Sequence, residues 1–387
     1  MIALVMNVGS TTLKYACIDT ESGERLTQGI VDRIGQPNGD APNHEVAAKS
    51  VLDSHATVQP DVVGHRIVHG GECFSAPAMV TPEALKNLAT LDDLAPLHNP
   101  PARAVVEGLA KSRPELKQVM VFDTAYFTTL PPAAYRYALP VSLYTDHGVR
   151  RYGAHGTSHQ LVTKLALAYL AKNRTNQNPS NQNSSGRIIS LHLGGGASVT
   201  ASIDGIAQET SMGMTPLEGL VMATRSGDLD PAVPLFLVKQ LGMTADQASS
   251  LLNQSSGLIG LCGDADMRTI LKRRDDGDPA ATLAIDVYVH RLVKTVGGYV
   301  AVLGGVDAIV FTAGVGENAS PIRSMLARQL QFLGLGLDEE RNTATIGPRE
   351  LTDVSSSTAT VRTLVIPTDE EFAIARKAAE LIDASRA

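Results

Sequence analysis

Two stretches of this 387-residue sequence decide its fold: LVMNVGSTTLKYACID at residues 4–19 and ISLHLGGGASVTASID at residues 189–204. Each contains an apolar strand, a turn rich in Gly or Ser, and a second strand that ends in Ile-Asp. A shift of 185 residues aligns them without a gap, with identities at Gly9 and Gly194, Ala16 and Ala201, Ile18 and Ile203, and Asp19 and Asp204. The alignment indicates two copies of one unit that begins with a β-hairpin.

A second pair of similar stretches favours the same duplication. DVVGHRIVHGGE at residues 61–72 and DAIVFTAGVGE at residues 307–317 both run from an apolar strand through a glycine turn to Glu, with a gap of one residue. Apolar residues at helical spacing from Ile285 to Leu303 predict a helix before the next turn, and Pro321 begins another helix. Strands that alternate with helices predict an α/β protein, here with two domains and a central cleft between the copies.

Composition excludes several classes of protein. Lys plus Arg is 33 and Asp plus Glu is 40, so the net charge of −7 argues against a general nucleic-acid binder. The longest apolar run, Val296–Val306, is too short to cross a bilayer, and the N-terminus MIALVMN lacks the basic region of a signal peptide. Cys17, Cys73 and Cys262 are too few and too widely spaced for a disulfide framework. We therefore expect a cytoplasmic protein that binds neither membrane nor nucleic acid.

Three glycine-rich turns have the pattern of phosphate-binding loops. NVGSTTLK, from Asn7 to Lys14, offers backbone N–H groups, hydroxyls and a cation, although an ordinary hairpin with a surface lysine has the same pattern. HLGGG, from His192 to Gly196, places three glycines inside a strand pair, which close approach to a ligand explains better than a bulge. GVGEN, from Gly314 to Asn318, follows a strand, where α/β sheets bind nucleotides.

Charged or titratable residues within apolar segments predict an anion-binding site. They are Arg66, Asp123, His155 and Arg225. Such residues need a partner or a ligand, so a buried Arg66–Asp123 ion pair is the structural alternative. The pairs His65/His69 and His155/His159 have the spacing of a zinc helix, but the neighbouring glycines argue against a helix through them.

The start of the C-terminal helix offers a ligand for Mg²⁺. Thr368 and Glu371 have the spacing of a capping box, which leaves Glu370 free. Mg²⁺ takes one or two protein oxygens together with substrate phosphates, and Asn7 with Glu370 would supply them. Glu370 would also favour a helix N-terminus without binding any metal.

Further motifs connect these residues to a known family. They are GHRIVHGGE, PLHNPP, FDTAYF, RRYGAHGTSH, TSMGMTPLEGLVMATRSGDLDP, TAGVGENA and IPTDEE. Together with the glycine turns they resemble the acetate kinases from Ile2 to about Ala378, and the segment from Thr210 to Pro231 is the most specific. The resemblance implies the duplicated ribonuclease H-like, actin-like ATPase fold that sugar kinases and Hsp70 share. It also implies a homodimer that transfers a phosphoryl group reversibly and in line from ATP to acetate, giving acetyl phosphate and ADP, with Mg²⁺ or Mn²⁺.

The resemblance also implies a role for individual residues. The metal ligands would be Asn7 and Glu370. The catalytic residues would be Asp123, His155 and Arg225. Acetate would contact Arg66, Val68, Leu97 and Pro216. The nucleotide would contact Lys14, His192, Leu193, Gly194, Gly195, Gly196, Asp266, Met267, Arg268, Gly314, Val315, Gly316, Glu317 and Asn318. The alternatives are a kinase for propionate or another short-chain acid, and an ATP-gated binding protein of the same fold.

The expected domains follow the same resemblance. Residues 1–148 would form the acyl-site domain, with a C-terminal helix at about 369–387 packing back on it, and residues 149–368 would bind the nucleotide. The polar stretch NRTNQNPSNQNSSG at 173–186 predicts a flexible surface loop. The chain departs from the family at Ala154, where Phe is usual, and this change predicts a wider acyl pocket unless Met214 refills it.

Overall fold

The computed structural model describes residues 1–54, 59–96, 98–174 and 186–386. These residues form two compact units. Unit 1 comprises Met1–Thr128, Ala154–Ser158 and Asp369–Ala387, and unit 2 comprises Thr129–Gly153 and His159–Thr368. Leu97 and most of the predicted loop at 173–186 lie outside the described residues. Asn173 and Arg174, predicted to lie in that loop, are instead the last residues of helix α6 (Gly156–Arg174).

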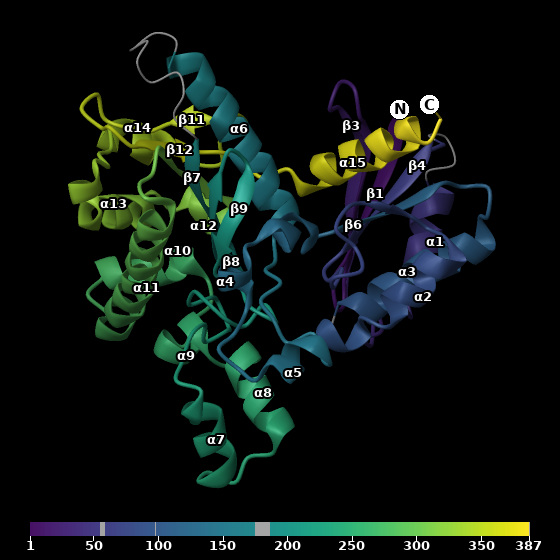
Figure 1. Ribbon diagram of the computed structural model, residues 1–387, viewed down its shortest axis with the longest axis horizontal. Coiled ribbons are helices and arrows are strands. Elements are labelled where there is room, and N and C mark those ends of the chain that lie inside the picture. Colours follow the sequence, from purple (N-terminus) through teal and green to yellow (C-terminus); the bar gives the residue numbers. More distant parts are fainter. Residues whose placement is uncertain (55–58, 97, 175–185, 387) are drawn as a thin grey trace. The chain divides into compact units, whose positions relative to one another are not determined.

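Unit 1 contains a six-stranded sheet with the order β3-β2-β1-β4-β6-β5 (Figure 1). Its strands are β1 (Ile2–Val8), β2 (Leu13–Asp19), β3 (Arg25–Val31), β4 (Val62–Ile67), β5 (Ala78–Met79) and β6 (Gln118–Phe122). Its helices are α1 (His44–Ser54), α2 (Pro82–Ala89), α3 (Asn99–Ser112) and α15 (Glu370–Ala384). Strands β1, β4 and β6 are parallel and the outer strands are antiparallel, so the carboxyl ends of the three central strands lie at one edge.

Unit 2 contains a second six-stranded sheet, with the order β9-β8-β7-β10-β12-β11. Its strands are β7 (Arg187–Leu193), β8 (Ala197–Ile203), β9 (Ile206–Thr210), β10 (Ala308–Thr312), β11 (Thr352–Asp353) and β12 (Arg362–Val365). Its helices are α4 (Pro132–Tyr135), α5 (Val141–Thr145), α6 from His159 onward, α7 (Ala232–Lys239), α8 (Ala245–Gln254), α9 (Gly257–Cys262), α10 (Met267–Asp275), α11 (Pro279–Leu303), α12 (Ala313–Asn318), α13 (Ser320–Gln329) and α14 (Glu339–Ala344). The two sheets have the same topology, which is the duplicated actin-like ATPase fold.

The two similar strand pairs of the sequence occupy equivalent positions in the two sheets. Ala3 of β1 pairs with Val62 of β4, and Ile188 of β7 pairs with Ala308 of β10. The aspartates that begin the stretches 61–72 and 307–317 make equivalent hydrogen bonds. Asp61 Oδ2 accepts the N–H of Ile2, and Asp307 Oδ2 accepts the N–H of Arg187, each at 2.8 Å. The duplication predicted from the sequence is therefore confirmed.

The ungapped alignment of the hairpins is wrong by one residue in the second strand. Ile2 pairs with Asp19, whereas its counterpart Arg187 pairs with Ile203 and not with Asp204. The turn after β7 is one residue shorter than the turn after β1, since Val8 pairs with Leu13 and Leu193 pairs with Ala197. Turn length sets the register of a hairpin, and two alternating apolar strands align about equally well in either register.

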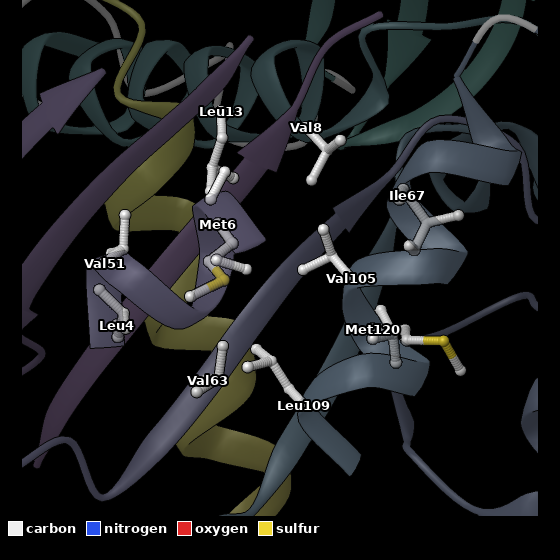
Figure 2. Packing of buried hydrophobic residues seen from close by; sticks show 14 of the residues in the cluster. Leu4, Met6, Val8, Leu13, Val51, Val63, Ile67, Val105, Leu109 and Met120 are labelled. Carbon is white, nitrogen blue, oxygen red and sulfur yellow. The ribbon is translucent and has the colours of Figure 1, made fainter. Parts of the chain in front are cut away.

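The core of unit 1 is aliphatic and lies on both faces of its sheet. On one face, Leu4, Met6 and Val63 pack with Val105 and Leu109 of α3 (Figure 2). On the other face, α15 supplies a second cluster of buried residues that includes Ile374, Ala375 and Ala378. Parallel strands that are covered on both faces read as continuous apolar runs, which is why β1, β4 and β6 were visible in the sequence.

Three predictions about helices can be compared with the structure. Helix α11 confirms the helical spacing from Ile285 to Leu303, and α13 confirms that Pro321 opens a helix. The capping box at Thr368 is wrong, because Asp369 caps α15 by accepting the N–H of Phe372. No helix in the described part of the chain is long and apolar enough to cross a bilayer.

The predicted domain boundary at residue 148 differs from the compact units, since unit 2 already begins at Thr129. Arg151 donates to the carbonyls of Thr210, Ser211 and Met212, and Tyr137 is bonded to Glu218. These contacts join the segment 129–153 to β9 and the residues after it. They link residues far apart in the chain, so no local pattern marks the boundary.

Candidate active site

Four of the predicted site residues meet at the carboxyl edge of the unit 1 sheet. Arg66 donates to Asp123 Oδ2 through Nη2 at 2.6 Å and through Nε at 3.1 Å. Its Nη1 donates to Asn7 Oδ1 at 3.1 Å, and Glu370 Oε2 lies 4.0 Å from its Nε. Asp123 is almost fully buried. The ion pair that was the structural alternative is therefore formed, and it lies within the predicted site.

The electrostatics of this cluster keep Arg66 charged. Burial alone lowers the pKa of Arg66, but the carboxylates of Asp123 and Glu370 outweigh burial and raise it. Burial raises the pKa of Glu370, which the charges of Arg66 and Lys14 partly oppose. One N–H on Nη1 and one on Nη2 of Arg66 are not used by Asp123 or Asn7. These two N–H groups could therefore donate to the two oxygens of a carboxylate.

The oxygens of Asn7 and Glu370 fit a Mg²⁺ site. Both residues lie beside the same Arg66 guanidinium, and Lys14 lies opposite Asn7 on the neighbouring strand. An amide and a carboxylate are the hard oxygen ligands that Mg²⁺ prefers, with phosphates and water completing its shell. Among the described residues no group of three or more His, Cys, Asp and Glu side chains could hold a metal ion. A site of two protein ligands would thus need a phosphate-bearing substrate.

His155 lies on a strained turn against Asp123. Its φ of +59° is in the left-handed region, which costs a non-glycine residue about 1 kcal/mol or more. The next residue, Gly156, donates its N–H to the carbonyl of Asp123 at 3.0 Å, and a Cβ there would overlap that carbonyl. Thr157 Oγ1 donates to Asp123 Oδ1 at 3.3 Å. The turn therefore ties His155 to the Arg66 cluster, and strain of this kind gathers at functional sites.

The structure describes most of the residues that the sequence predicts around the acyl pocket. Val68 is buried after β4, and Ala154 is buried beside His155, both in unit 1. Pro216 is half-buried in unit 2. Two of the histidines that have the spacing of a zinc helix make hydrogen bonds to other side chains. His65 Nε2 is hydrogen-bonded to Gln118, and the two ring nitrogens of His159 are hydrogen-bonded to Ser190 and Ser198. Those contacts leave no reason to assign zinc to them.

Two of the predicted nucleotide segments of unit 2 lie side by side, and the second, predicted as a glycine turn, is the short helix α12. Each follows one of two adjacent parallel strands, since His192 at the end of β7 pairs with Thr312 at the end of β10. A Cβ at Gly195 or at Gly314 would meet no atom within 4 Å, and neither glycine has a positive φ. The fold itself therefore does not require glycine at these two positions. Open space thus surrounds the backbone at both positions.

Glu317 and Asn318 make hydrogen bonds that stabilise α12, to which they belong. Glu317 Oε1 accepts the N–H of Ala313 at 2.8 Å and that of Thr368 at 2.9 Å. Asn318 Nδ2 donates to the carbonyl of Gly314 at 2.8 Å. Both side chains thus have structural contacts beside any contact with a nucleotide.

Arg323 also supports α12, although no pattern in the sequence indicated this role. Its guanidinium is fully buried and donates to the carbonyls of Gly316 and Glu317 at 2.9 and 3.0 Å. Its other bonds go to Asn342 and the carbonyl of Thr345. Burial lowers its pKa to about 10. An arginine in an amphipathic helix normally lies in water, so only the packed structure identifies this one.

The remaining predicted nucleotide residues are of two kinds. Leu193 and Met267 have side chains in the core, so a nucleotide would meet only their backbone. Asp266 caps α10 and pairs with Arg268 at 2.7 Å, and these contacts lower the pKa of Asp266. Arg268 is exposed at the start of that helix. The charged pair is available at the surface of unit 2.

Arg225 is a half-buried cation without a carboxylate partner among the described residues. Its Nη1 donates to the carbonyl of Pro216 at 3.2 Å and approaches Met222 Sδ at 3.8 Å. Burial lowers its pKa, and no neighbouring acid opposes that effect. The N–H of nearby Ala223 donates to the carbonyl of Gly195 at 3.1 Å, which joins this segment to the first glycine turn. A half-buried guanidinium that has no counter-ion in the described part of the chain is suited to binding an anion.

Two equivalent α/β units, one with adjacent glycine turns and the other with an Arg–Asp–Asn–Glu cluster, define an ATP-dependent phosphotransferase of the actin-like fold. Residues 43–376 match the acetokinase family. The chain belongs to this family, and ATP is its co-substrate.

Similar proteins match the chain over nearly its whole length. The acetate kinase of Micrococcus luteus is 46% identical over 394 residues, covering 98% of this chain and 99% of the relative. The crystal structure of Porphyromonas gingivalis acetate kinase has a TM-score of 0.89 at 39% identity, covering 98% of this chain and 99% of that one. The structure of a propionate kinase from Francisella tularensis has a TM-score of 0.88 at 36% identity with the same coverage.

Proposed function

We propose that the chain transfers the γ-phosphoryl group of ATP reversibly to acetate, giving acetyl phosphate and ADP. The observation that carries this proposal is Arg225, a half-buried cation with no carboxylate partner among the described residues, linked through Ala223 to the glycine turn at Gly195. Relatives named acetate kinase support acetate as the acceptor.

Unit 1 would bind the acceptor. The acetate carboxylate is ionised at neutral pH and needs no general base. It would accept hydrogen bonds from the N–H groups of Arg66 that Asp123 and Asn7 do not use. Asp123 and Asn7 hold that guanidinium in place. Val68 of unit 1 would contact the methyl group, a role that the family resemblance also implies for Leu97 and Pro216.

Unit 2 would bind the nucleotide at the turns His192–Gly196 and Gly314–Asn318 and at Asp266–Arg268. An acetate oxygen forms a bond to the γ-phosphorus as the bond from that phosphorus to the β,γ-bridging oxygen breaks, and ADP leaves with the electron pair. Arg225 and His155 would neutralise charge on the oxygens of the transferring group.

Asn7 and Glu370 would hold Mg²⁺, or Mn²⁺ in its place. A bound divalent ion neutralises phosphate charge and orients the phosphates. Lys14, which lies opposite Asn7, would add a further positive charge.

The proposal is tested by forming acyl hydroxamate from ATP, Mg²⁺, hydroxylamine and either acetate, propionate or butyrate. We expect hydroxamate from acetate that depends on ATP and on the metal. ATP binding without hydroxamate from any of the three acids would contradict the kinase assignment and favour an ATP-gated binding protein.

Ala154 favours propionate as a second substrate. Its side chain is buried beside His155, where related kinases usually carry Phe. We expect Ala154→Phe to raise the preference for acetate over propionate about 10- to 200-fold, because one methylene in an apolar pocket is worth about 1–3 kcal/mol. The measurement is kcat/KM for both acids, with the KM for ATP as a control. An unchanged ratio would show that Ala154 does not line the acyl pocket.

We further propose that the chain acts as a homodimer in a reducing compartment such as the cytoplasm. Leu235 and Phe236 of α7 and Leu241 after it are exposed and apolar, and a second copy would cover them. Cys17, Cys73 and Cys262 are free thiols. Light scattering is expected to give twice the chain mass of 40.8 kDa. A single-chain mass at micromolar concentration would contradict the dimer.

A further inference from the structure

Arg225 and Pro216 lie in a long segment without regular structure. Residues 211–231, between β9 and α7, form neither helix nor strand. Such a segment has no helical or sheet hydrogen bonds to fix its side chains. The orientation of Arg225 therefore depends on hydrogen bonds within the segment, such as the one to the carbonyl of Pro216, and on contacts from other parts of unit 2, such as the N–H of Leu258 to the carbonyl of Met222 at 2.9 Å.

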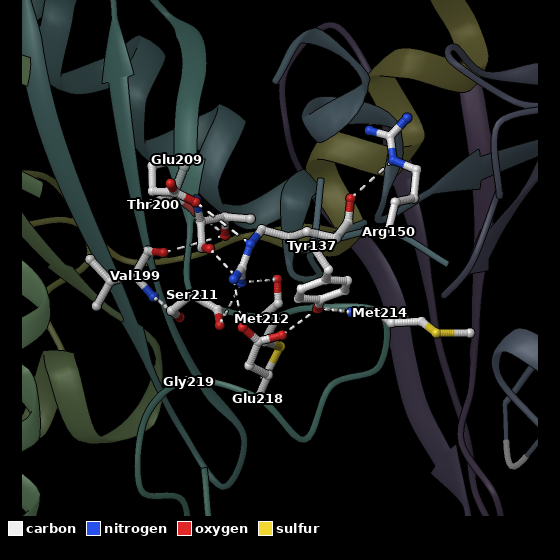
Figure 3. Close-up of polar contacts among 12 residues, drawn as sticks. Tyr137, Arg150, Val199, Thr200, Glu209, Ser211, Met212, Met214, Glu218 and Gly219 are labelled. Carbon is white, nitrogen blue, oxygen red and sulfur yellow. Dashed lines mark hydrogen bonds and ion pairs between the residues drawn. The ribbon is translucent and has the colours of Figure 1, made fainter. Parts of the chain in front are cut away.

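Arg151 supplies the first of these contacts, and Figure 3 labels Ser211, Met212 and Glu218, to which it donates. Its Nη1 donates to the carbonyls of Thr210, Ser211 and Met212 at 3.0, 3.2 and 3.1 Å, and its Nη2 donates to Glu218 Oε1 at 2.5 Å. Burial lowers the pKa of Arg151, but the charge of Glu218 and its other neighbours outweighs burial and raises it. One permanently charged guanidinium thus joins the start of the segment to Glu218.

Tyr137 holds Glu218 from the other side. Its hydroxyl donates to Glu218 Oε2 and accepts the N–H of Met214 at 3.0 Å. Burial and the adjacent carboxylate raise the pKa of Tyr137, so it remains a donor at neutral pH. A Cβ at Gly213 would overlap both Glu218 and Tyr137, which shows how closely the two side chains pack on the backbone.

The same segment closes on itself around Arg225. Gly219 donates its N–H to Asp228 Oδ1 at 2.7 Å, and Asp228 donates its N–H to the carbonyl of Gly219 at 2.9 Å. The carbonyl that orients Arg225 belongs to Pro216, two residues before Glu218. Glu218 therefore lies in the chain between Pro216, whose carbonyl accepts from Arg225, and Gly219, where the loop that carries Arg225 closes.

We propose that Tyr137, Arg151 and Glu218 are positioning residues that set the orientation of the Arg225 guanidinium for phosphoryl transfer. The proposal rests on the proposed function, because it assigns to Arg225 a role in stabilising the transferring group. A displacement of about 1 Å in a group of this kind costs about 100-fold in rate.

The first test is Tyr137→Phe, which removes one hydroxyl from the network. We expect kcat to fall about 10- to 100-fold, since a hydrogen bond to a charged group is lost, with little change in the KM for ATP. Glu218→Gln, which keeps an acceptor, should retain more activity than Glu218→Ala. The matched control is Tyr169→Phe, because Tyr169 donates to Asp353 Oδ2 at 2.6 Å from α6, within the same unit. The control should keep the wild-type kcat.

The second test is a double-mutant cycle with Arg225→Lys, measured by single-turnover transfer from radiolabelled ATP. If the network acts through Arg225, Tyr137→Phe should lower the rate much less in the Arg225→Lys background than in the wild type. Equal losses in both backgrounds, or a wild-type kcat for Tyr137→Phe, would overturn the positioning role. Absence of transfer by the wild-type protein would instead contradict the proposed function.

Discussion

Replacing Arg225 with lysine is expected to lower kcat about 10³-fold or more while the fold is retained. Arginines that neutralise a transferring phosphoryl group contribute roughly 10³–10⁵ in rate, and lysine lacks the planar fork that meets two oxygens. Arg225 makes no ion pair with a described residue, so its removal breaks none. The measurement is kcat for acetyl phosphate formation at saturating ATP and acetate.

Arg328→Lys is the matched control for Arg225→Lys. Arg328 is in the same unit and 72% exposed, and its ion pair with Glu339 at 3.2 Å contributes little to stability. Its kcat should equal that of the wild type. A near-native kcat for Arg225→Lys would remove Arg225 from the mechanism.

Replacing Asp123 with asparagine is expected to lower kcat/KM for acetate about 100-fold or more. Asp123 Oδ2 accepts two charge-assisted hydrogen bonds from Arg66, each worth about 1.5–3 kcal/mol, and an amide does not neutralise the guanidinium. Arg66 would then lose the orientation in which its free N–H groups meet acetate. The acetate dependence of the rate at saturating ATP measures this loss.

Asp92→Asn tests whether the loss is specific to this ion pair. Asp92 pairs with Arg103 at 2.7 Å, also in unit 1, but about a quarter of each side chain is exposed. The substitution removes the same charge from a similar pair and should leave kcat/KM for acetate unchanged. If both variants lose activity equally, the effect belongs to the stability of unit 1 and not to Arg66.

The sequence by itself determined the duplicated fold and the residue types of the site. Strands such as β1 and β7 are buried on both faces and are therefore mostly apolar, so they are visible without a structure. The glycine-rich motifs HLGGG and GVGEN stand out by composition, and the structure adds that the fold alone does not require glycine at 195 and 314. Family motifs then supplied the roles of Arg66, Asp123 and Arg225, which stay predictions until they are measured.

Only the tertiary structure decided which side chains support one another. Arg151 and Glu218 are 67 residues apart, and Tyr137 and Glu218 are 81 apart, so no local pattern joins them. The register of the second hairpin and the cap of α15 at Asp369 each differ from the prediction by one residue. Local propensity specifies the type of an element and only roughly its ends, whereas hydrogen bonds between distant segments and close packing fix register, caps and buried polar partners.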